Sequence, residues 1–304
     1  MNLQGFQFKI LKHIKLKWCN SITKLPKFSA PNLETLDLSY CHKLVTVHEL
    51  CVPNLETFDL SYCYKLVTVH ESVGFLDRLR KWDLRFCESL QNLPNNLRLK
   101  SLEVFVLDKC SKLEKFPNIH QEMKRLKKLL LSWSGIRELP SSIGYLTQLT
   151  ELQLNGCHNL RDLPDSIYKL QMLEVLCIKF TAKLRPPCNS FDGLSEYGFP
   201  SLRELYIHEC GIELELWMKP NYFPVLKVLD LSGSDIASIP ESLHRFTTLE
   251  TLSIENCKQL RQILRLPPFI KYVDASDCTS LDAQSSSRLL NQVSLFQVII
   301  KNHK

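Results

Sequence analysis

One pattern of leucines recurs along almost the whole chain and limits the folds that it can adopt. The clearest copy, Leu149–Pro164, reads L-T-E-L-Q-L-N-G-C-H-N-L-R-D-L-P and generalises to L1-x2-x3-L4-x5-L6-x7-x8-C9-x-x-L-x-x-L-P. Successive copies lie 21 to 24 residues apart, except for one interval of 29. Because repeats of this length pack mainly against their neighbours, one continuous array can fill the chain. Aligned on position 1, repeats 1 to 12 begin at Leu11, Leu33, Leu55, Leu79, Leu102, Leu126, Leu149, Leu173, Leu202, Leu226, Leu249 and Ile270.

The segment around positions 4 and 6 predicts a short β-strand in every repeat. Apolar and polar residues alternate there, so the leucines face a core and the residues between them face solvent. Ser141 and Asp165 follow prolines and are helix-start signals, although about ten residues leave room only for a helical turn. We therefore predict an α/β solenoid, a right-handed leucine-rich repeat horseshoe with a concave parallel β-sheet and short helical or irregular convex segments. The strands should centre on Leu36–Leu38, Leu129–Leu131, Leu152–Leu154 and Leu229–Leu231.

The pattern also predicts where the array begins and ends. We expect about twelve repeats over residues 1–282, interrupted near 186–200 by a loop rich in Pro, Gly, Asn and Ser. That loop is either a tolerated surface insertion or a partner contact. Beyond residue 282 the pattern stops, and 283–304 is expected to be a C-terminal tail or the truncated start of a further domain.

Most of the twelve cysteines belong to the repeat and do not suggest a disulfide framework. Ser134, Thr181 and Ser234, which are also small, replace cysteine at position 9 in other repeats. A small side chain with a weak donor suits a turn where strand-end carbonyls need a partner, and in a reducing compartment we expect free thiols. The predicted structural cysteine column comprises Cys19, Cys41, Cys63, Cys87, Cys110, Cys157, Cys210, Cys257 and Cys278.

Composition and absent motifs exclude several classes of function. The chain is 44% hydrophobic and 23% charged, as in globular proteins. We expect a cytoplasmic or nuclear protein with no membrane contact, because it shows no signal-peptide run, membrane-length apolar stretch or N-x-[ST] sequon. Phosphate-loop, H-E-x-x-H and C-x-x-C motifs are also missing. We therefore expect no enzyme activity, no cofactor or metal, and no small-molecule substrate.

Charge placement argues against nucleic-acid binding. Positions 2, 3, 5, 7 and 8 lie on or beside the predicted concave face, and they hold 13 Lys or Arg and 16 Asp or Glu, a net charge of −3. The whole chain carries +6, so the remaining positions carry +6 − (−3) = +9. A nucleic-acid reader would place its basic residues on its binding face, and this chain does not.

Aromatic residues gather at position 8, in Trp18, Tyr40, Tyr62, Phe86 and, further on, Trp133 and Phe180. Exposed aromatic and aliphatic clusters commonly mark protein contacts, although these rings could instead only stack along the sheet edge. Both interpretations stay open. A shallow apolar patch with few polar groups suits a protein surface better than a small metabolite. The candidate protein-binding residues are Arg85, Val106, Leu130, Trp133, Lys179, Phe180 and Tyr206.

Three stretches carry a more specific resemblance. They are P-N-L-E-T-L-D-L-S-Y-C-H-K-L-V-T-V-H-E, R-E-L-P-S-S-I-G-Y-L-T-Q-L-T-E-L-Q-L-N-G-C-H-N-L-R-D-L-P and L-P-P-F-I-K-Y-V-D-A-S-D-C-T-S-L-D. Together they resemble the leucine-rich repeat region of plant intracellular immune receptors, of the class with a Toll/interleukin-1-receptor domain and a nucleotide-binding domain. The resemblance covers about residues 8–282. It implies recognition of a pathogen effector or a guarded host protein, and contact with the receptor's nucleotide-binding domain that restrains the resting state.

Two other classes of leucine-rich repeat protein have a different repeat pattern. Substrate-recruiting subunits of ubiquitin ligases also carry cysteine at position 9, but their repeats continue C-x-x-[IL]-[TS]-D-x-G-[LI], whereas this chain continues C-x-x-L-x-x-L-P. Receptor ectodomains would show Asn at position 9 followed by G-x-I-P. The ubiquitin-ligase subunit remains the alternative.

Overall fold

The computed structural model describes residues 8–181, 198–210, 214, 218–285, 287 and 297–299. They belong to two compact units, Met1–Leu170 and Gln171–Lys304, called here the N-terminal and C-terminal units. Each unit coils as a leucine-rich repeat solenoid with a parallel sheet, as the repeat pattern predicted. Most of the expected 186–200 loop, including Cys188, and most of segment 283–304 lie outside the described residues.

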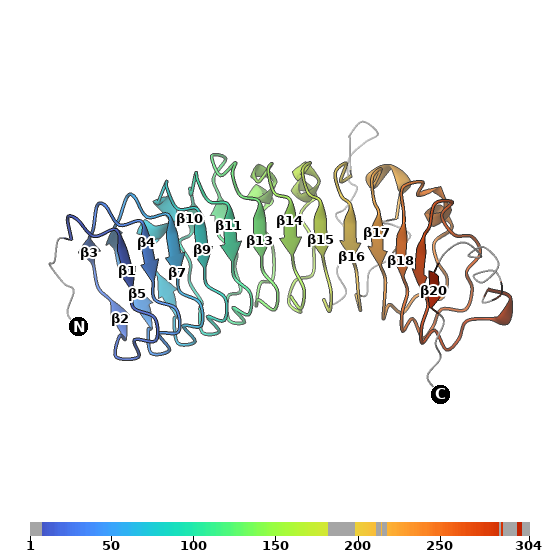
Figure 1. The fold of residues 1–304 in the computed structure, drawn as a ribbon, viewed down its shortest axis with the longest axis horizontal. Helices are drawn as coiled ribbons and strands as arrows, with labels where there is room; N and C mark the ends of the chain where they lie inside the picture. The colour runs from blue at the N-terminus through green and yellow to red at the C-terminus, as the bar shows by residue number, and fades with distance from the viewer. Residues whose placement is uncertain are drawn as a thin grey trace. The chain divides into compact units, whose positions relative to one another are not determined.

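The sheet of the N-terminal unit takes one three-residue strand from each of its seven repeats (Figure 1). Neighbouring strands pair in parallel and in register, so that Leu36 lies beside Phe58 and Phe105 beside Leu129. This register follows from the constant repeat length, which returns the chain to the same height after each turn. The strands, in spatial order, are β1 (His13–Lys15), β4 (Thr35–Asp37), β7 (Thr57–Asp59), β9 (Lys81–Asp83), β11 (Val104–Val106), β13 (Lys128–Leu130) and β14 (Glu151–Gln153).

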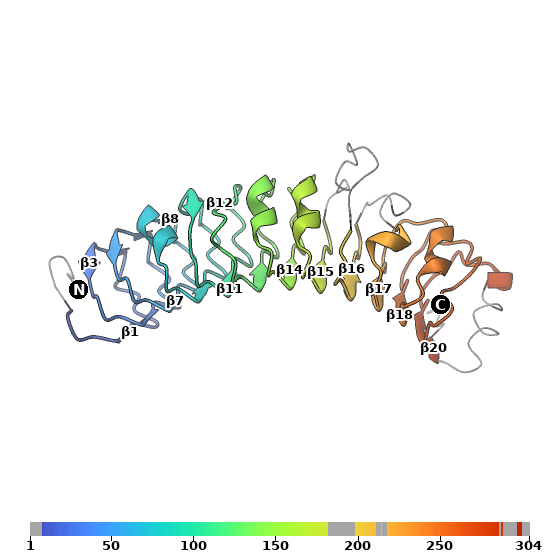
Figure 2. The same cartoon turned by 90° about the horizontal axis from the view of Figure 1, so that it is seen from above.

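The side of the N-terminal unit away from this sheet consists of very short strands and 3₁₀-helices (Figure 2). Two of the helices, η2 (Ser141–Tyr145) and η3 (Asp165–Lys169), lie at the predicted start signals. Pro140 and Pro164 precede them with φ of −67° and −68°, the value that the proline ring imposes. The other elements are β2 (Lys24–Leu25), β3 (Phe28–Ser29), β5 (Thr46–Val47), β6 (Leu50–Cys51), β8 (Thr68–Val69), η1 (Glu71–Phe75), β10 (Asn96–Leu97) and β12 (Asn118–Ile119).

The C-terminal unit repeats this plan and adds a strand beyond the last leucine repeat. That strand, β20 (Gln297–Ile299), pairs in parallel with β19, with Val273 beside Val298. It lies in the segment expected to be a tail or the start of a further domain. The unit contains β15 (Val175–Cys177), β16 (Glu204–Tyr206), η4 (Pro220–Tyr222), β17 (Val228–Asp230), η5 (Glu241–Arg245), β18 (Thr251–Ser253), β19 (Tyr272–Asp274) and β20.

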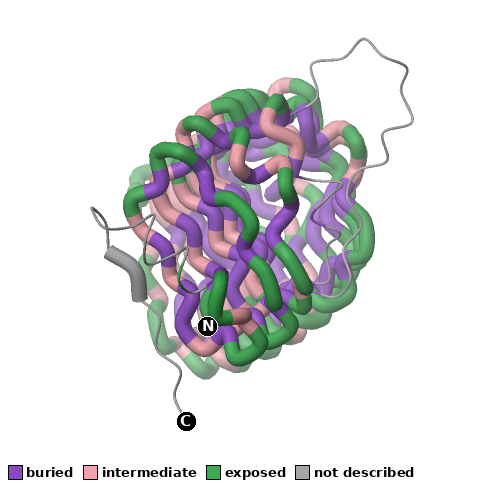
Figure 3. Tube along the Cα trace, turned by 90° about the vertical axis from the view of Figure 1, so that its right-hand side faces the viewer, coloured by how far each residue is buried: buried purple, intermediate pink, exposed green. Residues whose placement is uncertain are grey.

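The repeated leucines are buried, and Figure 3 marks the buried residues of the chain in purple. Leu36 and Leu38, at positions 4 and 6, are each 0% exposed, and full burial of a leucine side chain contributes about 1.5–3 kcal/mol. In repeats 3 to 5 position 4 is aromatic, and Phe58, Trp82 and Phe105 form a buried stack with ring centroids 6.5 and 4.9 Å apart. The side chains at positions 3, 5, 7 and 8 are therefore the ones left to form a surface on the sheet side.

Candidate binding surface

Position 8 adopts the left-handed backbone conformation in all twelve repeats, with φ between 49° and 66°. L-residues other than Gly, Asn and Asp rarely adopt it, at a cost of about 1–2 kcal/mol. The strand therefore ends in the same tight turn in every repeat. The sequence does contain a signal for this turn, because four repeats have Gly156, Gly233, Asn256 or Asp277 at position 8, all residue types that tolerate positive φ.

The aromatic residues at position 8 of repeats 1 to 4 stack on one another. Successive ring centroids from Trp18 through Tyr40 and Tyr62 to Phe86 are 4.1, 4.4 and 4.5 Å apart, and the interplanar angles are 21° or less. The ammonium of Lys109 lies 4.6 Å from the Phe86 ring centroid and extends the stack by a cation–π contact. We call these four rings the aromatic ladder. In these four repeats the rings at position 8 stack along the sheet edge, as one of the two interpretations predicted. Trp18 nevertheless keeps 55% of its surface exposed.

The cysteines of the column lie in the turns of their repeats and, from Cys41 onward, link each of these turns to the previous repeat. The Cys63 thiol donates to the carbonyl of Leu38 at 3.2 Å, and the Cys157 thiol donates to that of Leu131 at 3.1 Å. Burial raises the pKa of Cys41 to about 11 and that of Cys63 further, so both thiols keep the proton that they donate. The same bond to the preceding strand is made by Cys41, Cys87, Cys110, Cys210, Cys257 and Cys278.

Trp133 is the most accessible of the predicted contact residues, with 44% of its surface exposed. Its indole lies over Gly156 of the next repeat, where a Cβ atom would stand 2.5 Å from Cε3 of the indole. The His158 ring meets it edge-on, with centroids 5.4 Å apart. Because Gly156 has no side chain, the indole lies against backbone and is held in a defined exposed position.

The other predicted residues of the N-terminal unit differ from expectation in two ways. Val106 is only 1% exposed, so we remove it from the candidate contacts. The cause is its place in an interior strand, where Asp83 and Leu130 flank it in register. Arg85 is bound to Asp83, with Nη2 2.8 Å from Oδ2, and this hydrogen-bonded carboxylate raises the pKa of the guanidinium. Asp83 was missed by the sequence analysis and is 3% exposed. Leu130 is half-buried.

In the C-terminal unit, the predicted residues form a polar and aromatic cluster. The Lys179 ammonium lies 3.2 Å from Oδ2 of Asp230 and 4.6 Å from the centroid of the Tyr206 ring. The Tyr206 hydroxyl donates to Glu204 at 2.9 Å, and burial followed by this carboxylate raises the pKa of Tyr206. Phe180, at position 8, packs against His208 with centroids 4.9 Å apart.

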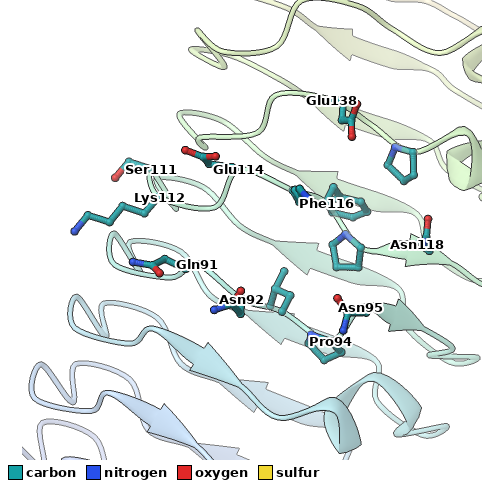
Figure 4. Close-up of a pocket in the computed structure, with 14 residues that line it drawn as sticks. Gln91, Asn92, Pro94, Asn95, Ser111, Lys112, Glu114, Phe116, Asn118 and Glu138 are labelled. Carbon is teal, nitrogen blue, oxygen red and sulfur yellow. The ribbon is translucent and has the colours of Figure 1, made fainter.

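A groove of about 740 Å³ lies on the N-terminal unit at the L-P segments of repeats 4 to 6 (Figure 4). Its lining combines amide side chains, including Asn92 and Asn118, with Pro94 and Phe116. Glu114, also in the lining, is paired with Arg137 at 2.8 Å. These side chains can donate and accept hydrogen bonds, but the arrangement does not place a nucleophile beside a general base, so we do not treat the groove as a candidate catalytic site.

Among the described residues, no group of three His, Cys, Asp or Glu side chains could hold a metal ion. No helix within the described ranges is both long and apolar enough to cross a membrane.

Comparison with known sequences identifies the family. The family model for leucine-rich repeats of RPS4B-like disease resistance proteins matches residues 98–287, which is more than half of the chain. The chain belongs to this family. It is 31% identical to TMV resistance protein N of Nicotiana glutinosa over 85% of its own length, and 28% identical to disease resistance protein RPS4B of Arabidopsis thaliana over 71%. The RPS4B-like repeats of this chain span only 25% and 17% of those two relatives.

Solved structures agree on the fold. The chain superposes on the leucine-rich repeat domain of the type III effector XopL with a TM-score of 0.51 and 21% identity, covering 67% of this chain and 70% of the other. Leucine-rich repeats are in general a non-catalytic fold that mediates protein–protein interaction. The RPS4B-like array is thus a protein-interaction fold from a family of plant disease resistance proteins.

Proposed function

We propose that this chain is the recognition module of a plant disease-resistance receptor. It binds a pathogen effector or a guarded host protein, and it contacts the receptor's nucleotide-binding domain to restrain the resting state. It acts in the cytoplasm or nucleus, without catalysis, cofactor, nucleic acid or membrane contact. The observation that carries the proposal is the exposed indole of Trp133, held on a sheet edge in an array of the disease-resistance family.

The energetic argument for a protein ligand rests on the kind of side chain that remains exposed. A large aromatic residue with a fixed orientation loses little conformational entropy on binding, and such residues supply most of the free energy of protein interfaces. Trp133 and Leu130 provide apolar area in the N-terminal unit, and Phe180 and Tyr206 provide it in the C-terminal unit. Lys179 and Arg85 are already paired with carboxylates of this chain. We therefore expect them to orient a bound partner more than to add to its binding free energy.

The test measures binding and restraint separately. The purified chain is titrated with a panel of pathogen effectors and host proteins, and each binding pair is remeasured with Trp133→Ala and Tyr206→Ala. Each substitution should weaken the interaction by about 2 kcal/mol, roughly 30-fold, if its residue is a hot spot. Trp18→Ala, at a more exposed tryptophan that also occupies position 8, should leave binding unchanged. Specific binding of RNA or of a metabolite, with no protein ligand, would contradict the proposal.

Restraint is tested by co-expressing this chain with the nucleotide-binding region of a related receptor in leaf tissue. The chain should suppress the cell death that the nucleotide-binding region causes alone. Undiminished cell death in the presence of stably expressed chain would overturn this part of the proposal without affecting the first.

A further inference from the structure

The turn after the strand of repeat 6 is one residue shorter than the turns beside it. Position 6 and the next core residue are Leu131 and Ile136, five residues apart, whereas Leu154 and Leu160 of repeat 7 are six apart. Repeats 4 and 5 also have the six-residue spacing. The missing residue falls directly after Ser134 at position 9, because repeat 6 reads W-S-G-I where repeat 7 reads G-C-H-N-L.

The shortened turn packs closely against repeat 5. The Gly135 amide donates to the carbonyl of Cys110 at 3.1 Å, and a Cβ atom at Gly135 would collide with the carbonyl of Ser111. From the other side, the Asn159 side-chain amide donates to the carbonyl of Gly135 at 3.3 Å. The turn is thus fixed on both sides in a recessed position, and Gly135 is the residue type that this close approach requires.

The recess opens a hollow of about 510 Å³ whose lining comes from repeats 4 to 7. Its lining includes the small residues Ser134 and Gly135, the partly exposed indole of Trp133, and Gly156, against which that indole lies. Lys109 and Glu88 contribute from the N-terminal side. The hollow therefore combines a flat aromatic surface, small lining residues and one charge of each sign.

We propose that this hollow binds an aromatic side chain from an exposed loop of a protein partner, with a neighbouring carboxylate on that loop paired to Lys109. The proposal deepens the proposed function, on which it rests, by naming the chemistry that the module recognises. A ring inserted beside Trp133 would stack or pack edge-on, and such aromatic pairs contribute beyond their buried area.

Two observations select this occupant. First, the aromatic ladder of the same unit shows that the edge at position 8 accommodates flat rings at 4.1–4.5 Å spacing, with Lys109 already over the last ring. Second, the lining includes the exposed Lys109, which gives a carboxylate beside the inserted ring an ion-pair partner. The hollow is open to solvent, which suits a side chain presented by a partner better than a metabolite that a site must enclose.

The experiment titrates the full ¹⁵N-labelled chain with N-acetyl-Asp-Phe-Asp-amide and follows the indole N–H signals by NMR. The Trp133 signal, assigned from its loss in Trp133→Phe, should shift and saturate, while that of Trp18 should not. N-acetyl-Asp-Ala-Asp-amide and N-acetyl-Lys-Phe-Lys-amide should each bind about tenfold more weakly, because each lacks one of the two contacts. Equal binding of the alanine peptide, or an equal shift at Trp18, would overturn the proposal.

A second variant fills the hollow without changing Trp133. One residue inserted after Gly135 restores the six-residue spacing and should abolish the Trp133 shift. The matched insertion after Asp235, in another five-residue turn, from Leu231 to Ile236, should preserve it. Unchanged indole signals of Trp18 and the buried Trp82 would show that the fold is intact. Peptide binding by a folded variant with the insertion after Gly135 would contradict the inference. If the peptides fail while a protein ligand is found at other residues, this inference fails and the proposed function stands.

Discussion

A Cβ atom on Gly156 would lie 2.5 Å from Cε3 of the Trp133 indole, so the ring occupies the space that a side chain of the next repeat would fill. This pairing of a glycine with an exposed tryptophan fixes the indole and leads to the first prediction.

Gly156→Ala should displace the Trp133 indole and destabilise the chain by about 1–3 kcal/mol, because the residue has φ of +66° and the ring is rigid. Gly233→Ala is the matched control. Gly233 has φ of +64°, but a Cβ there would meet the flexible Glu209 side chain at 2.5 Å, which can move aside. Denaturant unfolding should show the larger loss at Gly156, and tryptophan fluorescence should change only there. Equal losses and unchanged fluorescence would mean that the indole does not depend on Gly156.

Cys157→Ala should cost about 1–3 kcal/mol, because it removes the thiol that donates to the buried carbonyl of Leu131. Cys157→Ser should cost less, since a hydroxyl can donate in the same place, as Ser234 does to Ile207. Cys51→Ala, at an exposed cysteine outside the column, should change the free energy of unfolding little. Urea unfolding of the three variants tests this order. Similar losses of unfolding free energy for Cys157→Ala and Cys51→Ala would show that the column has no structural role.

Tyr62→Ala should destabilise the chain by about 1–3 kcal/mol, because Tyr62 stacks on both Tyr40 and Phe86. Trp18→Ala, at the end of the ladder, has one stacked ring partner in Tyr40 and should cost less. Thermal unfolding monitored by circular dichroism distinguishes the two. A greater loss at Trp18 would indicate that stacking along the ladder contributes little.

Asp108→Asn should stabilise the chain at neutral pH. Burial raises the pKa of Asp108, against the opposing effects of the Ser132 backbone amide and Arg85, and nearby Asp83 raises it further. A carboxyl whose pKa is raised by folding favours the folded state at low pH, and this contribution is lost as pH rises through the folded pKa. Asparagine keeps an oxygen that can accept from Ser132 and carries no charge.

The gain from Asp108→Asn should therefore be present at pH 7 and disappear at a pH below the pKa of an unperturbed aspartate, where Asp108 is neutral in both states. Unfolding free energies of both proteins between pH 3 and pH 7 check it. A gain that is equal at both ends of this range would exclude the charge as its cause.

The solenoid was predictable because the leucine spacing determines both the strand and its alternation. Leu36, Leu38 and their equivalents face the core as expected. The surface was harder to predict. The alternation of apolar and polar residues indicates which side of the sheet a side chain faces, but not whether neighbouring side chains bury it. Val106 alternates outward and is still buried by the strands on either side, and Arg85 is held by Asp83. The burial of Val106 depends on repeats more than 20 residues away, which a single repeat does not reveal. The Arg85–Asp83 pair lies within one repeat, but alternation alone does not say which exposed side chains pair.

The left-handed turn at position 8 separates backbone geometry from surface chemistry. Tyr40, Lys109, Glu209 and Asn256 share one conformation within about 12°, the spread between φ of 49° and 61°. A substitution at position 8 therefore alters the charge, size or hydrogen bonding of the side chain while the backbone keeps the same turn. The array offers twelve such positions. Where the side chain at position 8 does not contact the next repeat, a single substitution can change specificity without altering the fold. Gly156 and the aromatic ladder are the exceptions, because neighbouring side chains pack against them.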